Sequence, residues 1–314
     1  MSPGPPDRLA LLEAVTRALV DPVFVLDRDG RYLEAFGGSD RAAYDSLAYL
    51  VGKTLHDIMP AAIADGFLAD VRRVIDTGQP HVYEYTLSAD DCAGNAHDGP
   101  PGPQWFMGRI APIVAGAGDV PDCVAWVVIN ITRRRQLEAE LQRFATTDEL
   151  TGLLNRRAFL ARLEAAMETA RAAGLPLALA ILDLDHFKAV NDRFGHAVGD
   201  AFLRYVAKAL LAWPAAGKVL GRIGGEEFAV LFEGLALPSA AALLREWQAQ
   251  FHVRPFELAD QAIGVAFSAG VVAMADEDAS TTDLLRRADH WLYEAKHAGR
   301  GLVAHPGWID RRLG

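Results

Sequence analysis

Arg222-Ile223-Gly224-Gly225-Glu226-Glu227-Phe228 continues into Ala229-Val230-Leu231-Phe232, and this stretch decides the fold. Apolar residues flank a Gly-Gly pair, which predicts two strands joined by a tight hairpin whose turn needs positive φ. Two carboxylates, Glu226 and Glu227, follow the glycines, where a ligand can approach the backbone closely because glycine has no Cβ. Taken alone, such a sequence is more often a solvated hairpin tip than a site, so its meaning depends on what lies near it.

A second acidic element lies upstream, in Ile181-Leu182-Asp183-Leu184-Asp185. Its apolar residues predict a strand, and that strand ends in carboxylates. Two acidic strand ends that converge could hold a divalent metal ion at a phosphate-handling site. The second element therefore favours a site over a solvated tip.

The composition is that of a globular protein long enough for two domains. The chain has 314 residues, of which 51% are hydrophobic and 23% charged. A net charge of -10 argues against a protein that coats nucleic acid, although a nucleotide enzyme needs positive charge only locally.

Cys92 and Cys123 form neither a metal-binding spacing nor a disulfide framework, which favours a reducing compartment. No apolar run approaches the ~18 residues of a membrane span, and residues 1–8 look like a disordered leader without signal-peptide features. We therefore expect a cytoplasmic protein with no nucleic-acid partner and no membrane partner.

The first part of the chain alternates strands and helices with turn signals between them. Residues 88–103, rich in Gly, Pro, Asp and Asn, have the composition of a surface loop. The pattern predicts a small α+β sensor module with an antiparallel sheet. The expected elements are a helix over 7–19, strands over 23–26 and 31–36, mostly helix over 40–78, and strands over 82–87, 104–112 and 123–131.

Residues 9–131 resemble the PAS family. The resemblance depends on Val25-Leu26-Asp27-Arg28-Asp29-Gly30-Arg31-Tyr32, Gly52-Lys53-Thr54-Leu55, Trp105-Phe106-Met107-Gly108-Arg109 and Asn130-Ile131-Thr132. The family usually ends in Asp-Ile-Thr, and Asn130 replaces that acid, which leaves its usual salt bridge open. Some PAS domains bind haem, flavin or metabolites. His56 and His81 could be ligands, but a lone histidine is more often a surface or packing residue, so the ligand of this domain stays unknown.

Residues 132–146 are predicted to form a polar linker helix. Leu137, Leu141 and Phe144 are spaced by four and three, which suits a short two-stranded coiled coil. A helix that packs on its own domain would show the same stripe, and the pattern alone does not decide between the two.

Residues 147–305 are predicted to form a second domain, followed by a tail over 306–314. Leu177 to Leu182 is an apolar run of strand length, which predicts a strand buried on both sides. Strands alternate with helices around a mixed sheet, which is typical of an α/β sandwich. The expected helices carry Phe159 to Ala170, Leu203 to Leu210, residues 239–251 and residues 282–297, and the other expected strands are the hairpin, 265–274 and 302–304.

This domain resembles the GGDEF family of diguanylate cyclases, which join two GTP molecules into cyclic di-GMP and release pyrophosphate. The family's fold resembles the palm of nucleotidyl cyclases and polymerases. Four motifs carry the resemblance: Asp148 to Arg157, Asp183-Leu184-Asp185-His186-Phe187-Lys188 with Asn191-Asp192, the hairpin, and Asp289 to Gly301.

The resemblance implies a metal and a set of catalytic residues. Magnesium, two ions per active site with Mn²⁺ as a substitute, would be held by Asp183, the backbone carbonyl of Leu184, and Glu226. Glu226 or Glu227 would take the proton from the attacking 3′-hydroxyl; we favour Glu226 as base and ligand, and the choice stays open. Lys188 and Arg222 complete the catalytic set, since phosphoryl transfer depends on charge stabilisation.

The resemblance also implies how GTP is bound. Gly224 and Gly225 would let the backbone pass close to the nucleotide. Asn191 and Asp200 would read guanine, with His196 nearby, because a carboxylate accepts from the two donors on the guanine edge. Lys296 and Arg300, four residues apart, would share one face of the last helix and hold the terminal phosphates.

One departure from the family pattern concerns regulation. Many members carry an inhibitory product site, Arg-x-x-Asp, and the two charged positions are here Ala215 and Lys218. We therefore expect no product inhibition through that site. Because each domain holds one GTP, the working unit should be a homodimer formed through the PAS domain and linker helix. The alternative is a catalytically silent GGDEF domain used as a nucleotide-binding or scaffolding module.

Overall fold

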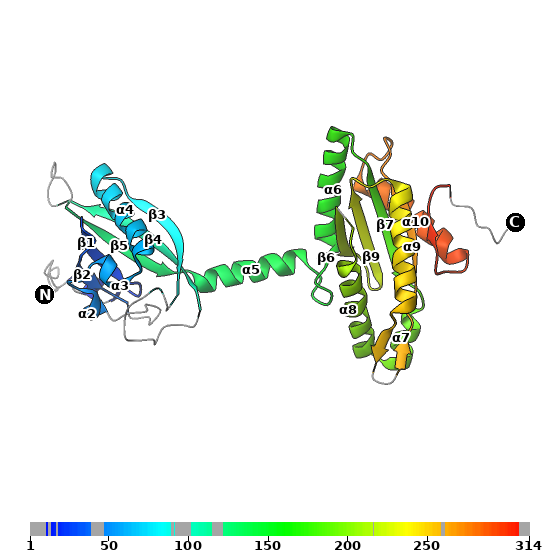
Figure 1. Cartoon of the computed structure of the whole chain (residues 1–314), viewed down its shortest axis with the longest axis horizontal. Coiled ribbons are helices and arrows are strands. Elements are labelled where there is room, and N and C mark those ends of the chain that lie inside the picture. Colours follow the sequence, from blue (N-terminus) through cyan, green and yellow to red (C-terminus); the bar gives the residue numbers. More distant parts are fainter. Residues whose placement is uncertain are drawn as a thin grey trace, which may run out of the picture. The chain divides into compact units, whose positions relative to one another are not determined.

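The computed structural model describes residues 11, 14–16, 18–38, 47–88, 91, 102–114, 122–215, 217–258 and 261–307. The expected leader, most of the loop over 88–103 and most of the tail lie outside these residues. The chain divides into two compact units, Met1–Ala139 and Glu140–Gly314, each built around its own sheet (Figure 1). In the part of the chain described, no helix has the length and apolar character that a membrane span requires.

The first unit is built on a five-stranded antiparallel sheet in the order β2-β1-β5-β4-β3. Its long helix α4 begins after Pro60, and Gly78 ends it in the left-handed conformation with φ of 66°. Helix α4 buries Ala64, Phe67, Val71, Val74 and Ile75 against the sheet, at the spacing of one helix face. The elements are β1 (Val23–Asp27), β2 (Tyr32–Phe36), α2 (Leu47–Leu50), α3 (Leu55–Ile58), α4 (Ala61–Thr77), β3 (His81–Leu87), β4 (Gln104–Ile113) and β5 (Cys123–Asn130). The predicted α+β fold with an antiparallel sheet is confirmed.

Helix α5 (Thr132–Thr146) starts directly at the end of this sheet. The Thr132 amide donates to Asn130 Oδ1 at 2.9 Å, so Asn130 serves the helix start through its side-chain oxygen. Glu84 of β3 supplies the acid, because it pairs with Arg134 at 3.1 Å and also with Arg135. The negative charge that Asn130 lacks is therefore supplied from β3, which β4 separates from β5 in the sheet.

The second unit is a mixed six-stranded sheet in the order β13-β12-β7-β9-β8-β6. Every residue of β7 is buried, as the apolar run predicts. Alternate residues of β7 and β9 face two separate cores: one contains α8 and α9, and the other contains α6 and α10. Helices thus cover both faces of the sheet, and the α/β sandwich is confirmed (Figure 1).

Several elements of this unit were not anticipated by the sequence pattern. Helix α7 follows β7 directly, and the short β6 and the β10–β11 hairpin escape a search for long apolar runs. The elements are β6 (Leu154–Asn155), α6 (Arg156–Ala173), β7 (Leu177–Leu184), α7 (Phe187–Phe194), α8 (His196–Ala212), β8 (Lys218–Arg222), β9 (Glu227–Glu233), α9 (Leu237–Val253), β10 (Phe256–Leu258), β11 (Gln261–Ile263), β12 (Phe267–Ala273), α10 (Thr281–His297) and β13 (Val303–Ala304).

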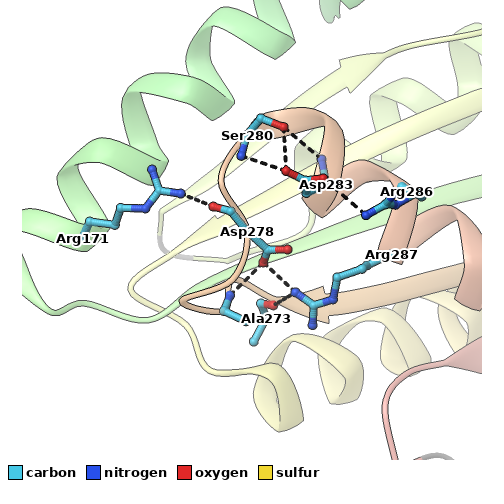
Figure 2. Close-up of polar contacts among 8 residues, drawn as sticks. Arg171, Ala273, Asp278, Ser280, Asp283, Arg286 and Arg287 are labelled. Carbon is cyan, nitrogen blue, oxygen red and sulfur yellow. Dashed lines mark hydrogen bonds and ion pairs between the residues drawn. The ribbon is translucent and has the colours of Figure 1, made fainter.

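The start of α10 is fixed by a buried carboxylate (Figure 2). Asp278, 1% exposed, accepts from the Ala275 amide at 2.8 Å and from Arg287 of α10 at 2.6 Å. Arg171 of α6 donates to the Asp278 backbone carbonyl. Ser280 and Asp283 form a capping box at the first turn of α10.

The middle of α10 lies directly on β12 at Gly270. A Cβ at this position would lie 2.1 Å from the Ala288 carbonyl oxygen and 2.2 Å from the Leu292 nitrogen. Only glycine allows the helix backbone this close to the strand. The C-terminal end of α10 is thereby held near the end of β7.

Candidate active site

The two acidic elements converge at the end of β7. Asp183 stands opposite Glu227 in the β7–β9 ladder, and the Leu184 amide donates to the Glu226 carbonyl at 3.2 Å. Lys296 of α10 places its ammonium 2.8 Å from Asp183 Oδ2. The Asp183 side chain is only 9% exposed, so the pair lies in a largely desolvated position. The structure therefore brings Asp183, Leu184, Glu226 and Lys296 together.

The electrostatics of this cluster single out Glu226. Burial raises the pKa of its carboxyl group, the charge of Asp183 raises it further, Lys296 partly offsets this, and Glu227 adds to it. Two carboxylates that repel each other in a desolvated place suit a divalent cation, which would relieve the repulsion. The described residues contain no group of three or more His, Cys, Asp or Glu side chains that could hold a metal ion. A metal here would thus be held by two carboxylates and backbone oxygen, which fits Mg²⁺.

The hairpin turn corrects one expectation from the sequence. Strand β8 ends at Arg222 and β9 begins at Glu227, and the amides of Ile223 and Gly224 both donate to the Glu227 carbonyl. Neither Gly224 nor Gly225 has positive φ, so the turn does not need the left-handed conformation. A Cβ on Gly224 would instead lie 2.3 Å from Glu227 Oε2, whereas one on Gly225 would meet nothing within 4 Å. The Glu227 side chain thus lies over Gly224, and a residue with a Cβ at that position would have to displace the end of that side chain.

Arg222 braces the hairpin in this structure. Its Nη1 lies 3.1 Å from both carboxylate oxygens of Asp148, and its Nη2 donates to the Gly225 carbonyl at 2.7 Å. The pKa of Asp148 is lowered: burial would raise it, but bonds from Thr151 and Arg222 outweigh that effect. Arg156 holds the other side of the turn, donating to the Ile223 carbonyl at 3.1 Å.

Two further residues of the opening motif hold the end of α5. Asn155 Nδ2 donates to the Ala145 carbonyl at 3.0 Å, and Arg157 donates to the same oxygen at 2.7 Å. The opening motif, Asp148 to Arg157, therefore ties the C-terminal end of α5 to the base of the hairpin. The sequence identified this motif only through a family resemblance, because its contacts with the hairpin join residues more than 60 positions apart, as with Arg156 and Ile223.

Arg300 does not share a helix face with Lys296, so that prediction is wrong. Helix α10 ends at His297, and Arg300 lies in the following turn with φ of 65°. The chain reverses there because β13 must return beside β12, with the Ala269 amide bonded to the Leu302 carbonyl at 2.8 Å. Lys296 and Arg300 are instead neighbours across the turn, since the Arg300 amide donates to the Ala295 carbonyl at 3.1 Å.

The residues expected to read guanine lie on a second pair of helices. Asn191 is on α7, and His196 and Asp200 are in the first turns of α8. A Cβ on Gly199 would lie 1.9 Å from Asn191 Oδ1, so the Asn191 side chain lies directly against the start of α8. The structure thus places Asn191 close to the helical turn that carries Asp200. Lys188 is exposed in the first turn of α7.

Lys218 is turned inward. Its ammonium donates to the carbonyls of Leu210 at 2.7 Å and Leu211 at 3.2 Å, and also to that of Trp213. These carbonyls belong to the C-terminal end of α8, which a positive charge stabilises. Burial lowers the pKa of Lys218. The lysine that stands in the Arg-x-x-Asp position therefore caps a helix.

Comparisons with known proteins place both units in families. The family described as diguanylate cyclase, GGDEF domain, matches residues 145–302, and the PAS fold matches residues 16–136. A diguanylate cyclase of Vibrio cholerae is 30% identical over 296 residues, covering 93% of this chain and 88% of that protein. The response regulator PleD of Caulobacter vibrioides is 37% identical over 172 residues, but the matched part covers only 38% of PleD and 54% of this chain.

Solved structures agree. The coiled coil and GGDEF domain of DgcB from Caulobacter crescentus, in complex with c-di-GMP, aligns at 34% identity with a TM-score of 0.52, covering 56% of this chain and 93% of that one. Diguanylate cyclase SiaD of Pseudomonas aeruginosa, solved with its activator SiaC, aligns at 33% identity with a TM-score of 0.50, covering 55% of this chain and 66% of that one. The chain belongs to the GGDEF family of diguanylate cyclases, with a PAS domain before the GGDEF domain.

The raised pKa of Glu226 predicts a pH-dependent stability effect in metal-free buffer. A carboxyl group whose pKa is raised on folding favours the folded state below its unfolded pKa and loses that contribution as pH rises through the folded pKa. Glu226→Gln, which carries no charge, should therefore gain melting temperature relative to wild type on going from pH 4 to pH 8, by a few degrees at most. Thermal unfolding followed by circular dichroism at both pH values measures this. Glu168→Gln, on the exposed face of α6, is the matched control. An equal difference at the two pH values would contradict the assignment.

Proposed function

We propose that the chain is an active, PAS-regulated diguanylate cyclase that condenses two GTP molecules into cyclic di-GMP and two pyrophosphates. The observation that carries the proposal is the convergence of Asp183 and Glu226 beside the Lys296 ammonium at the end of a buried strand. This arrangement supplies oxygen ligands for a metal and a positive charge for phosphates in one place. The family membership supports the same reaction.

Asp183, the Leu184 carbonyl and Glu226 would hold Mg²⁺, two ions per site, with Mn²⁺ able to substitute. When bound, the metal supplies charge neutralisation on the phosphates of GTP. Glu226 takes the proton from the attacking 3′-hydroxyl, because its raised pKa brings it closer to the range in which a general base works well. Glu227, whose carboxylate lies over Gly224, is the alternative base.

The remaining residues position GTP and stabilise the charge that builds on the phosphoryl group. Lys188 and Arg222 act on the reacting phosphate, and Arg222 also fixes the hairpin through Asp148 and the Gly225 carbonyl. Lys296 and Arg300 bind the terminal phosphates. Gly224 and Gly225 form the backbone beside the nucleotide. Asn191 and Asp200 bind the guanine edge with His196 nearby, which favours GTP over ATP because mismatched polar groups are costly.

Two copies of the chain must face each other, since each site holds one GTP. Helix α5 supports a dimer: none of its residues is buried, and Leu137, Leu141 and Phe144 are 41%, 68% and 53% exposed on one stripe. A second copy of α5 would cover that stripe as a short coiled coil. The PAS domain would then bias whether the two sites meet. A cytoplasmic location, where GTP and Mg²⁺ are available, fits this role.

A catalytically silent GGDEF module is the second candidate. Nothing in the site favours it, because the acidic pair and the lysine beside it are all in place. The activity assay below separates the two functions.

Purified protein incubated with GTP and Mg²⁺ should produce cyclic di-GMP, detected by chromatography, and no cyclic product from ATP. Glu226→Gln should lower the rate about 100-fold or more, because both the base and a metal ligand are lost. Glu168→Gln should leave the rate unchanged. Full activity in Glu226→Gln, or no product from wild type with either Mg²⁺ or Mn²⁺, would contradict the proposed reaction.

Product inhibition through the Arg-x-x-Asp position should be absent. Ala215 carries no charge, and the Lys218 ammonium is committed to the α8 carbonyls, so neither position can grip a nucleotide. The initial cyclase rate should change less than about twofold when cyclic di-GMP is added at micromolar concentrations. Strong inhibition that Lys218→Ala relieves would show that the expectation is wrong.

Disrupting the α5 stripe should separate the copies. Leu141→Asp places a charge in the proposed dimer contact and should shift the full chain toward monomer in light-scattering chromatography, with a matching loss of cyclase activity. Gln142→Asp introduces the same charge on the neighbouring, polar face of α5 and should leave both properties intact. A dimer that survives Leu141→Asp, with unchanged turnover, would exclude this contact.

A further inference from the structure

We propose that Asp185 is a positioning residue for triphosphate binding: it fixes the turn 298–301 and so holds Arg300 at the site formed by Asp183 and Lys296. The inference rests on the proposed function, in which Arg300 binds the terminal phosphates. It gives a role to the second aspartate of this acidic strand end, whereas the family resemblance assigns only the first, Asp183, to the metal site.

Both carboxylate oxygens of Asp185 contact structural donors. Oδ1 accepts from the hydroxyl of Ser268, a fully buried residue of β12, at 2.8 Å. Oδ2 accepts from the Gly301 amide at 2.9 Å. The Asp185 amide donates to the Ala266 carbonyl at 2.9 Å, which extends the β7–β12 ladder by one step. Asp185 thus joins the end of β7 to the chain that follows α10.

The two neighbours of this network have unusual backbone conformations. Among the residues that the structure describes, His186 with φ of 60° and Arg300 with φ of 65° are the non-glycine residues with positive φ. The first follows Asp185 directly, and the second precedes Gly301. A residue with a side chain is strained in this region and persists there only where surrounding contacts determine the conformation. The Asp185–Gly301 bond is one such contact for Arg300.

The turn is also anchored from its own helix. The Arg300 amide donates to the Ala295 carbonyl at 3.1 Å, and the Gly299 amide to the Lys296 carbonyl at 3.4 Å. The position of Lys296 is set by α10, which is held at its start by Asp278 (Figure 2) and in its middle by Gly270. The hydrogen bond from the Gly301 amide to Asp185 fixes the chain beyond the C-terminal end of α10. Different contacts therefore fix Lys296 and Arg300, the two cations proposed to bind the terminal phosphates of GTP.

Asp183 and Asp185 consequently have different chemistry. Asp183 faces Lys296 and raises the pKa of Glu226, which are the properties of a group in the metal and phosphate site. Asp185 accepts from an uncharged hydroxyl and a backbone amide, which are the properties of a group that orders a turn.

The test compares wild type, Asp185→Ala, Arg300→Ala, the double variant and Asp183→Asn as full chains. Asp185→Ala should raise the half-saturating GTP concentration about tenfold, the loss of one charge-assisted hydrogen bond acting through Arg300, while kcat stays within about twofold. The inhibition constant of GMP, which lacks the terminal phosphates, should not change.

The double variant should be no worse than Arg300→Ala, because the two residues act as one unit. Asp183→Asn should lose kcat. Asp276→Ala, an exposed carboxylate before α10, is the matched control and should behave as wild type.

Three results would overturn the inference: a fall in kcat like that of Asp183→Asn, a parallel loss of GMP affinity, or effects of Asp185→Ala and Arg300→Ala that multiply.

Hydrogen exchange tests the role of Asp185 without turnover. Asp185→Ala should speed exchange of the amides of residues 298–302, and unchanged protection of those amides would refute the inference. A wild type without cyclase activity would overturn the proposed function, while the exchange result would still decide the role of Asp185.

Discussion

The burial of the Asp183 carboxylate at the end of β7 is the constraint on which the rest of the catalytic unit depends. An ionised carboxylate in a largely desolvated place is costly unless an opposite charge lies next to it. Lys296 supplies that charge at 2.8 Å, and Lys296 can do so only because α10 runs along the sheet to this point. The close approach of α10 to β12 at Gly270 and the buried Asp278–Arg287 pair at its start can be understood as the scaffold for this one contact.

The hairpin completes the site from the opposite side of β7. Its turn is short and carries Glu226. The side chains of Arg222 and Arg156 hold this turn by donating hydrogen bonds to its backbone carbonyls. Arg222 is fixed in turn by Asp148, at the point where α5 ends. Helix α5, which leads out of the PAS domain, therefore ends next to the residues that hold the hairpin turn. Under the proposed function, this continuity is the route by which a signal that reaches α5 would act on the site.

At its other end, α5 is joined to the PAS sheet by charge and by capping. Glu84 pairs with Arg134, and Asn130 accepts from the Thr132 amide. The loss of the usual acid at Asn130 has not removed the junction, because Glu84 on β3 provides the negative charge. The same logic applies at Lys218, where the departure from the family pattern creates a helix cap, with an ammonium among three carbonyls, in place of a ligand site.

The sequence by itself determined the two-domain organisation, the buried strand β7, the acidic hairpin and the family, because these depend on apolar runs and on motifs contiguous in the chain. By resemblance it assigned Asp183 to the metal site, but it gave Asp185 no role, because the partners of that carboxylate, Ser268 and Gly301, lie 83 and 116 residues further along the chain. It expected positive φ at the Gly-Gly pair, which the turn does not use, and it put Arg300 on a helix that ends three residues earlier. The contacts of Asp185 and the position of Arg300 were decided by the tertiary structure. Strand β13 returns beside β12, so the chain turns after α10, and the carboxylate at the end of β7 accepts a hydrogen bond from that turn.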